Sequence, residues 1–258
     1  MKNVDSNIYD LKLLDEMAQK NSPIHRFHPL AKCIATMCFL VVLASFDRHE
    51  ISRLFLMALF PFYLLVFGEL SIKHFLKRLL VVEPLILGIG ILNPFFDSHQ
   101  IMIGTFSISM GWLTFASIAI KGTLSVLVSL ILIGTTGIDR LAEALRMLKV
   151  PKIFVLQLLL TYRYIGVLME ELSSMLRAYS LRAPGQKGVE FKAMGSFAGQ
   201  LLLRTYDRAQ RIYVAMKVRG FEGEYYVGST ARMKRKDYQF LIVWSVFFVV
   251  IRWVPLPW

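Results

Sequence analysis

Five long apolar runs dominate the sequence, and the stretches between them hold most of its charged residues. A helix needs about 20 mostly apolar residues to cross the ~30 Å hydrocarbon core of a bilayer. Each run therefore predicts a membrane-spanning helix, although the shorter ones only just qualify. In order, the runs occupy residues 31–46, 52–67, 79–96, 111–134 and 238–254, and Pro29 and Leu30 extend the first of them.

A sixth run, at residues 153–169, is nearly as apolar but carries Arg163 in its middle. A lipid-exposed charge there would cost at least ~2.5–3.5 kcal/mol. A crossing would also place the basic residues that follow it outside the cell. We therefore interpret this run as part of a long cytoplasmic or interfacial helix that begins at Pro151, a residue suited to the first position of a helix.

The charges between the runs predict the orientation of the chain. Residues 69–78 and 139–238 are rich in lysine and arginine, residues 47–51 are nearly balanced, and residues 97–110 contain neither basic residue. Basic connections tend to stay on the cytoplasmic side of a membrane. The pattern predicts five crossings, with the N-terminus inside and the C-terminus outside.

The composition excludes an ordinary soluble domain. Hydrophobic residues make up 55% of the chain, charged residues only 19%, and the mean hydropathy is +0.52. The formal net charge of +12 suits either nucleic acid or the cytoplasmic face of a membrane, and the hydropathy selects the membrane. Cys33 and Cys38 lie in one apolar run, so we expect them to be small core residues and not a disulfide or a zinc site.

The long basic segment predicts three helices. A short amphipathic helix covers residues 138–148. A long helix follows from 151 to about 181 and stops there, because Pro184 and Gly185 cannot continue it. A second long helix runs from about 190 to 219 and ends at Gly220, a residue suited to a left-handed helix cap.

The second long helix is expected to be two-faced. Its apolar stripe should comprise Met194, Phe197, Ala198, Leu201, Leu202, Ala209, Ile212 and Met216. Its solvated face should carry Arg204, Asp207, Arg208 and Arg211, with Asp207 and Arg211 at the i,i+4 spacing of an ion pair. Gly195 and Gly199 are expected to permit close packing of the two long helices.

Both long helices end in a similar tripeptide, Leu181-Arg182-Ala183 in the first and Val218-Arg219-Gly220 in the second, 37 residues apart. One interpretation is that each arginine complements the negative end of its helix dipole. The other is that each end plugs a groove on a soluble partner, where the guanidinium fork binds carboxylates or backbone carbonyls at two points. The repetition on paired helices of a membrane protein favours the second interpretation.

The second tripeptide lies in the run Arg204-Thr-Tyr-Asp207-Arg208-Ala-Gln-Arg211-Ile-Tyr-Val-Ala215-Met216-Lys-Val-Arg219-Gly220-Phe221. This run resembles the signature of the T components of energy-coupling-factor (ECF) transporters, and more narrowly that of the cobalt-type CbiQ branch. The run His28-Pro29-Leu30-Ala31-Lys32 is similar to the family's start to its first span. The resemblance covers residues 22–254 of the chain, approximately. The first tripeptide keeps the arginine of the family's Ala-Arg-Gly-like motif but replaces its alanine and glycine.

This resemblance implies a non-catalytic coupling subunit in the cell (inner) membrane. A T component links a membrane subunit that binds the substrate to two cytoplasmic ATPase subunits, and each arginine-bearing helix end sits in a groove of one ATPase subunit. The substrate subunit would be a cobalt-binding one, with a small accessory membrane subunit. ATP is bound by the partners, and no cofactor or metal is expected in this chain. The implied contact residues are Leu181, Arg182, Ala183, Val218, Arg219 and Gly220, supported by Arg204, Asp207, Arg208 and Arg211.

Other functional classes find less support. The same type of T subunit would serve a nickel or vitamin importer. A self-contained secondary transporter would show inverted repeats and polar residues in several spans, and a membrane enzyme would need clustered acids, bases or metal ligands. No Walker A, HExxH or GxSxG motif is present, a metal site at His25 and His28 is not expected, and neither is nucleic-acid binding.

Glu83 and Lys121 lie within apolar runs. They could form a structural pair, contact the membrane partner or belong to an ion path, and the sequence does not rank these three roles.

The expected fold is an all-α integral membrane protein with about five transmembrane helices and a cytoplasmic module of two long amphipathic coupling helices and one short one. Residues 1–28 would form an N-terminal cytoplasmic segment, with Leu11, Leu14, Met17 and Ala18 on one helical stripe. Residues 29–137 would hold four transmembrane helices, residues 138–238 the cytoplasmic module, and residues 239–258 the last transmembrane helix.

Overall fold

The computed structural model describes residues 16–20, 22–47, 50–92, 94, 100–103, 106–182, 189–223 and 232–253. The N-terminal stripe predicted at Leu11 and Leu14 lies outside these residues. The chain divides into two compact units. One, which we call the bundle, consists of Met17–Gly137 and Ala231–Trp258, and the other consists of Met1–Glu16 and Ile138–Thr230.

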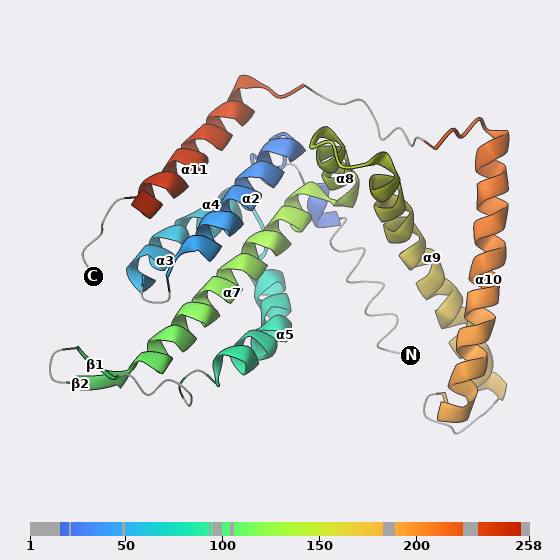
Figure 1. Cartoon of the computed structure of the whole chain (residues 1–258). Coiled ribbons are helices and arrows are strands. Elements are labelled where there is room, and N and C mark those ends of the chain that lie inside the picture. Colours follow the sequence, from blue (N-terminus) through green and yellow to red (C-terminus); the bar gives the residue numbers. More distant parts are fainter. Residues whose placement is uncertain are drawn as a thin grey trace. The chain divides into compact units, whose positions relative to one another are not determined.

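The bundle is built from helices around an aromatic core. In it, α2 packs against both α7 and α11, and α5 packs against α7 (Figure 1). Phe39 of α2, Phe60 of α4 and Phe248 of α11 are each at most 1% exposed, and their ring centroids lie 5.1–5.6 Å apart. The helices are α2 (Pro29–Ser45), α3 (Ile51–Met57), α4 (Leu59–Phe67), α5 (Ile72–Gly90), α7 (Met110–Thr136) and α11 (Arg235–Trp253).

The second predicted run is broken into two helices. Helix α3 ends at Met57 and α4 begins at Leu59, with Ala58 between them. Pro61 lies four residues after Met57; its nitrogen carries no hydrogen to donate to the Met57 carbonyl, and its ring crowds that carbonyl. The interruption therefore follows from one residue of the sequence.

The third predicted run begins earlier than expected. Helix α5 starts at Ile72, so Lys73, Lys77 and Arg78 lie in its first turns and not in a connection. Charge does not stop a helix, because lysine and arginine have good helix propensity and their long side chains reach the polar edge of a membrane. Pro84 lies inside the helix, which ends at Gly90.

A short β-hairpin stands where only a connection was expected. Strand β1 (Gln100–Ile103) pairs antiparallel with β2 (Phe106–Ser109), with Gln100 opposite Ser109 and Ile103 opposite Phe106. Strand β2 leads directly into α7 at Met110. The described part of the chain is therefore helical apart from this hairpin, which the all-α expectation omitted.

The second unit contains the three predicted helices of the basic segment. They are α8 (Ile138–Met147), α9 (Lys152–Arg182) and α10 (Phe191–Val218), each within two residues of its predicted ends. Helices α8 and α9 pack through Ala142, Val155 and Leu159, which are all buried. We call this unit the α8–α10 unit.

Two helices in the described residues are long and apolar enough to cross a bilayer, Gly111–Thr136 in α7 and Lys152–Arg182, which is α9. Pro29–Ser45 and Ile51–Phe67 are apolar but shorter. The predicted count of five crossings stays a prediction, and so does the interpretation of 153–169 as non-crossing.

Candidate functional site

Helices α9 and α10 form an antiparallel pair. Near one end, the rings of Tyr179 and Phe197 meet edge to face with their centroids 5.3 Å apart. Farther along, Glu171 of α9 contacts Arg204 of α10. Residues late in α9 thus meet residues early in α10, so Arg182 and Arg219 lie at opposite ends of the pair. Helix α10 has 28 residues, which at ~1.5 Å per residue gives a length of about 40 Å.

One carboxylate joins the two helices by ion pairs. Glu171 Oε1 accepts a hydrogen bond from Arg204 Nη1, and Arg208 Nη2 lies 3.8 Å from Glu171 Oε2. The Glu171 side chain is 25% exposed, whereas those of Arg204 and Arg208 are 56% and 40% exposed. Sequence reasoning missed Glu171. The available signal was its spacing from Leu172, Met175 and Tyr179, which places it beside the helix face that meets α10.

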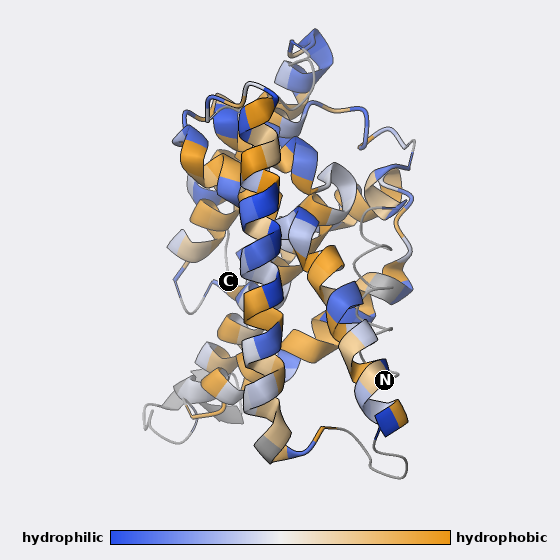
Figure 2. Cartoon of the chain, turned by 90° about the vertical axis from the view of Figure 1, so that its right-hand side faces the viewer, coloured by the Kyte–Doolittle hydropathy of each residue, from blue (hydrophilic) through white to orange (hydrophobic). Residues whose placement is uncertain are grey.

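These contacts correct the predicted faces of α10. Arg204 and Arg208 turn toward α9 instead of lying wholly on a solvated face. Among the described residues, no ion pair joins Asp207 to Arg211, and both side chains are exposed. An exposed i,i+4 pair is worth only about 0.3–0.5 kcal/mol, which is too little to hold two mobile side chains together. Figure 2 shows hydrophilic and hydrophobic residues alternating along α10, the helix nearest the viewer.

The end of α9 presents an apolar residue beside its arginine. Leu181 is 83% exposed and Arg182 is also exposed. Among the described residues, the Arg182 side chain has neither an ion pair nor a hydrogen bond. Ala183, the third residue of this tripeptide, lies outside the described residues.

The end of α10 is closed by its own backbone. Gly220 has φ +80°, its N–H donates to the Lys217 carbonyl at 3.0 Å, and the Phe221 N–H donates to the Met216 carbonyl at 3.0 Å. This is the Schellman pattern, which satisfies carbonyls at a helix end. Arg219 is therefore not needed to bond them, and within the described residues its exposed side chain has no partner. Val218 beside it is 84% exposed.

A groove of about 480 Å³ runs between α9 and α10 toward the Arg219 end. Its walls are mainly apolar, with Ile153, Leu156 and Leu160 on α9 and Ile212 and Met216 on α10. The arginine-bearing end of α10 therefore adjoins an apolar depression within the same unit.

The two charges inside the apolar runs have separate partners in the bundle. Lys121 Nζ donates to the Phe46 carbonyl at 2.6 Å, at the C-terminal end of α2. Glu83 Oε1 lies 3.0 Å from Thr123 Oγ1 of α7. The structure thus gives each charge a contact within the chain, but Glu83 and Lys121 are not paired with each other.

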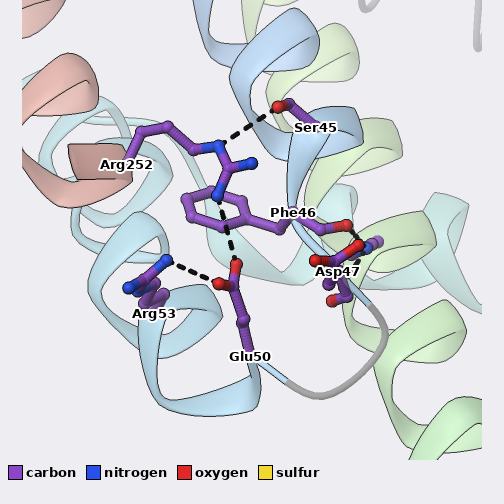
Figure 3. Close-up of polar contacts among 7 residues, drawn as sticks. Ser45, Phe46, Asp47, Glu50, Arg53 and Arg252 are labelled. Atoms are coloured by element: carbon purple, nitrogen blue, oxygen red, sulfur yellow. Dashed lines mark hydrogen bonds and ion pairs between the residues drawn. The ribbon is translucent and has the colours of Figure 1, made fainter. Parts of the chain in front are cut away.

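The Lys121 contact belongs to a cluster of charges at the end of α2. Glu50 forms ion pairs with Arg53 at 2.6 Å and with Arg252 of α11 at 3.6 Å. Arg252 Nε also donates to Ser45 Oγ at 3.2 Å (Figure 3). These contacts join α2, α3 and α11, so the cluster has a structural role in the bundle.

His25 and His28, the two histidines considered as metal ligands, contact different polar groups. His25 Nε2 lies 2.9 Å from the Met17 carbonyl, and His28 Nδ1 accepts a hydrogen bond from the Leu30 N–H at 3.2 Å. Within the described residues, no three His, Cys, Asp or Glu side chains group closely enough to hold a metal ion.

The long apolar helices suit a membrane protein, and comparison with known proteins gives its family. The family model described as "Cobalt transport protein", CbiQ, matches residues 20–227. The chain belongs to this family and is of the ECF T-component type. It is a component of a membrane transporter and not a catalytic enzyme.

Three relatives illustrate the similarity. The energy-coupling factor transporter transmembrane protein EcfT of Listeria innocua is 27% identical over 224 residues, covering 79% of this chain and 82% of the relative. EcfT of Brevibacillus brevis is 26% identical over 254 residues, covering 89% and 93%. The nickel permease LarQ of Lactiplantibacillus plantarum is 30% identical over 117 residues, a match that spans 44% of this chain and only 43% of LarQ.

Proposed function

We propose that this protein is the T subunit of an ECF importer and transmits ATP-driven motion from two cytoplasmic ATPase subunits to a membrane substrate-binding subunit. One observation carries the proposal: Arg182 and Arg219 are exposed at opposite ends of one antiparallel helix pair. ATP would be bound by the ATPase subunits, and this chain would need no cofactor.

The chemistry of the two ends suits docking into grooves. Each arginine stands next to a large apolar residue that is more than 80% exposed, Leu181 at 83% and Val218 at 84%. Docking would bury these residues, and the guanidinium fork would bind carboxylates or carbonyls on the partner. Two ends separated by about the length of α10, ~40 Å, allow each to engage a different ATPase subunit.

The contacts between α9 and α10 would make the two helices move together as one rigid pair. The Tyr179–Phe197 ring contact lies near the Arg182 end, and Glu171 holds Arg204 and Arg208 farther along. Displacement of one end would therefore move both helices. In this proposal Arg204 and Arg208 support the pair, while Asp207 and Arg211 remain at its surface.

The proposed topology is multi-pass in the cell (inner) membrane, with the N-terminus and the α8–α10 unit in the cytoplasm. The basic residues of the α8–α10 unit support this orientation. Helix α9 is apolar enough to span a bilayer, but Arg163 is exposed on it, and a lipid-facing arginine is costly. We place α9 at the cytoplasmic side on this ground.

Cobalt is the proposed substrate, since the matching family is described as a cobalt transport protein. The importer would then include a cobalt-binding membrane subunit and a small accessory membrane subunit. Nickel is the second candidate, because one relative is named a nickel permease. Uptake of each ion by the assembled complex in proteoliposomes decides between them.

The test is the double substitution Arg182→Ala with Arg219→Ala in the complete complex. Loss of one partner of a desolvated charge pair costs about 2–5 kcal/mol, so the variant should insert normally but lose ATPase subunits on purification and lose uptake. Arg211→Ala, an exposed arginine on the same helix, should cost under ~1 kcal/mol and serves as the matched control. A double variant that assembles and transports like the wild type would show that the arginines only complement helix dipoles.

A further inference from the structure

The chain passes between the bundle and the α8–α10 unit at three points. Two of these points are the bonds between residues 16 and 17 and between residues 137 and 138, and the third lies between residues 223 and 232. If motion of the α8–α10 unit drives transport, the covalent chain transmits this motion to the bundle at these crossings. One short stretch of the bundle, residues 17–32, begins at the first crossing and contacts α7 and α11 close to the other two.

At the first crossing, a buried histidine holds Met17. His25 is 4% exposed, its Nε2 lies 2.9 Å from the Met17 carbonyl, and its Nδ1 lies 2.6 Å from Ser22 Oγ. A carbonyl can only accept, so Nε2 carries the hydrogen, and in the neutral ring Nδ1 then accepts from the serine hydroxyl. Met17 itself is 7% exposed. The chain is therefore fixed to the bundle as soon as it enters it.

At the second crossing, a buried lysine holds the last turn of α7. Lys32 is 3% exposed, and its Nζ donates to the Thr135 carbonyl at 2.8 Å. Gly137 follows with φ +73°, a left-handed conformation, and a Cβ there would stand 3.2 Å from the Cβ of Ala18. Helix α8 begins at the next residue, Ile138. Only Gly137 thus separates the clamped end of α7 from the α8–α10 unit.

At the third crossing, a buried aspartate ties the start of α11 to the start of α2. Asp237 is 4% exposed; its Oδ1 accepts from the His28 N–H at 2.9 Å, and its Oδ2 accepts from the Lys234 N–H at 2.7 Å. A carboxylate is well placed at the positive ends of two helices. The stacked rings of Phe27 and Phe240, with centroids 4.7 Å apart, support the same junction.

We propose that residues 17–32 are the joint through which the α8–α10 unit moves the bundle, and that Lys32 and Asp237 are its positioning residues. This inference rests on the proposed function. Helix α2 already packs against α7 and α11, and the bonds made by Lys32 and Asp237 fix the ends of these helices to it. Without one of these bonds, the end of α7 or the start of α11 can shift farther relative to α2, so ATP hydrolysis would continue with less transport.

The experiment measures the number of metal ions imported per ATP hydrolysed. Complexes with Lys32→Met would be reconstituted in proteoliposomes and supplied with Co²⁺ or Ni²⁺, whichever the wild-type complex imports. Substitutions along a path between two sites can change the coupling between those sites about twofold to thirtyfold. We expect a fall within that range, with ATP hydrolysis retained. Lys32→Arg keeps a donor for the Thr135 carbonyl and should recover most of the ratio.

Lys121→Met is the matched control. Lys121 makes the same kind of bond, from its amine to the carbonyl of Phe46 just past the end of α2, but at none of the crossings. A general loss of bundle stability would lower the ratio equally in both variants, and that result would overturn the inference, as would an unchanged ratio in Lys32→Met.

Should Lys32→Met fail to assemble, Asp237→Asn takes its place, because asparagine can keep only one of the two bonds. Its ratio of ions imported per ATP hydrolysed is then compared with that of Lys121→Met in the same way. A wild-type complex that hydrolyses ATP without uptake would instead refute the proposed function, and the joint with it.

Discussion

At the scale of single residues, the helix ends of the α8–α10 unit depend on backbone in the left-handed region. Lys149 follows α8 with φ +63°, and Gly220 follows α10 with φ +80°. After α8, the Val150 N–H donates to the Leu145 carbonyl at 3.2 Å, so both helices end in the same backbone motif. Glycine adopts this conformation freely, whereas other residues are strained in it by about 1–2 kcal/mol.

Substitutions at these two positions should therefore act in opposite directions. Lys149→Gly relieves strain and should raise the free energy of unfolding by about 0.5–1 kcal/mol after the entropy of glycine is counted. Gly220→Ala introduces strain and should lower it by about 1 kcal/mol, although a Cβ there meets no atom within 4 Å. Thermal unfolding of the purified protein in detergent measures both changes, and shifts of the same sign would contradict the prediction.

Residue orientation was the part of the site that the sequence predicted least well. Phe197, Leu201, Ile212 and Met216 of the predicted stripe are partly buried, but Leu202 is 69% exposed and Met194 is 55% exposed. A two-helix contact covers a narrower strip than the apolar surface of α10, so the pattern alone does not show which apolar residues are covered. A Cβ added at either Gly195 or Gly199 would meet no atom of another element within 4 Å, so the predicted close packing at these glycines is wrong.

At the scale of elements, local stop signals predicted the long helices well. Pro151 precedes α9, Pro184 follows it, and Gly220 follows α10, so each predicted end depends on a residue that commonly begins, stops or closes a helix. The start of α5 and the β-hairpin were missed. The basic residues of 69–78 suggested a connection before the third run, but charge does not prevent helix formation. The hairpin depends on pairing between two strands of only four residues each, which is too short for a clear alternating pattern.

The stability of the α9–α10 pair should come more from its aromatic contact than from its ion pairs. The groups around Glu171 are partly exposed, so Glu171→Gln should cost under ~1 kcal/mol and matter less at high salt. Phe197→Ala removes the ring that meets Tyr179 and should cost more, since such a pair contributes about 0.5–1.5 kcal/mol beyond the area buried. Hydrogen exchange of the α10 amides compares the two variants, and a larger loss of protection in Glu171→Gln would reverse this ranking.

At the scale of the whole molecule, helix length and hydropathy do not select the same membrane-spanning helices as the pattern of charges. Length and composition single out α7 and α9 as long enough to cross a bilayer, while α2 and the α3–α4 run are shorter. Helix α5 carries three basic residues within its first two turns, and α11 carries Arg235, Lys236 and Arg252 near its ends. Short helices with charged ends can still span a membrane by thinning it or by extending their side chains to its surface.

Cysteine labelling tests the topology. In a variant with Cys33 and Cys38 replaced by alanine, a single cysteine at position 187 should react with a membrane-impermeant maleimide only after the membrane is opened, because the basic segment around it is predicted to be cytoplasmic. A single cysteine at position 98, in the stretch without lysine or arginine, should react from outside in intact cells and serves as the control. If α9 crossed the bilayer, position 187 would stand outside and label as readily as position 98. That result would place the Arg182 end on the wrong side of the membrane for an ATPase subunit and would refute the proposed docking of both helix ends.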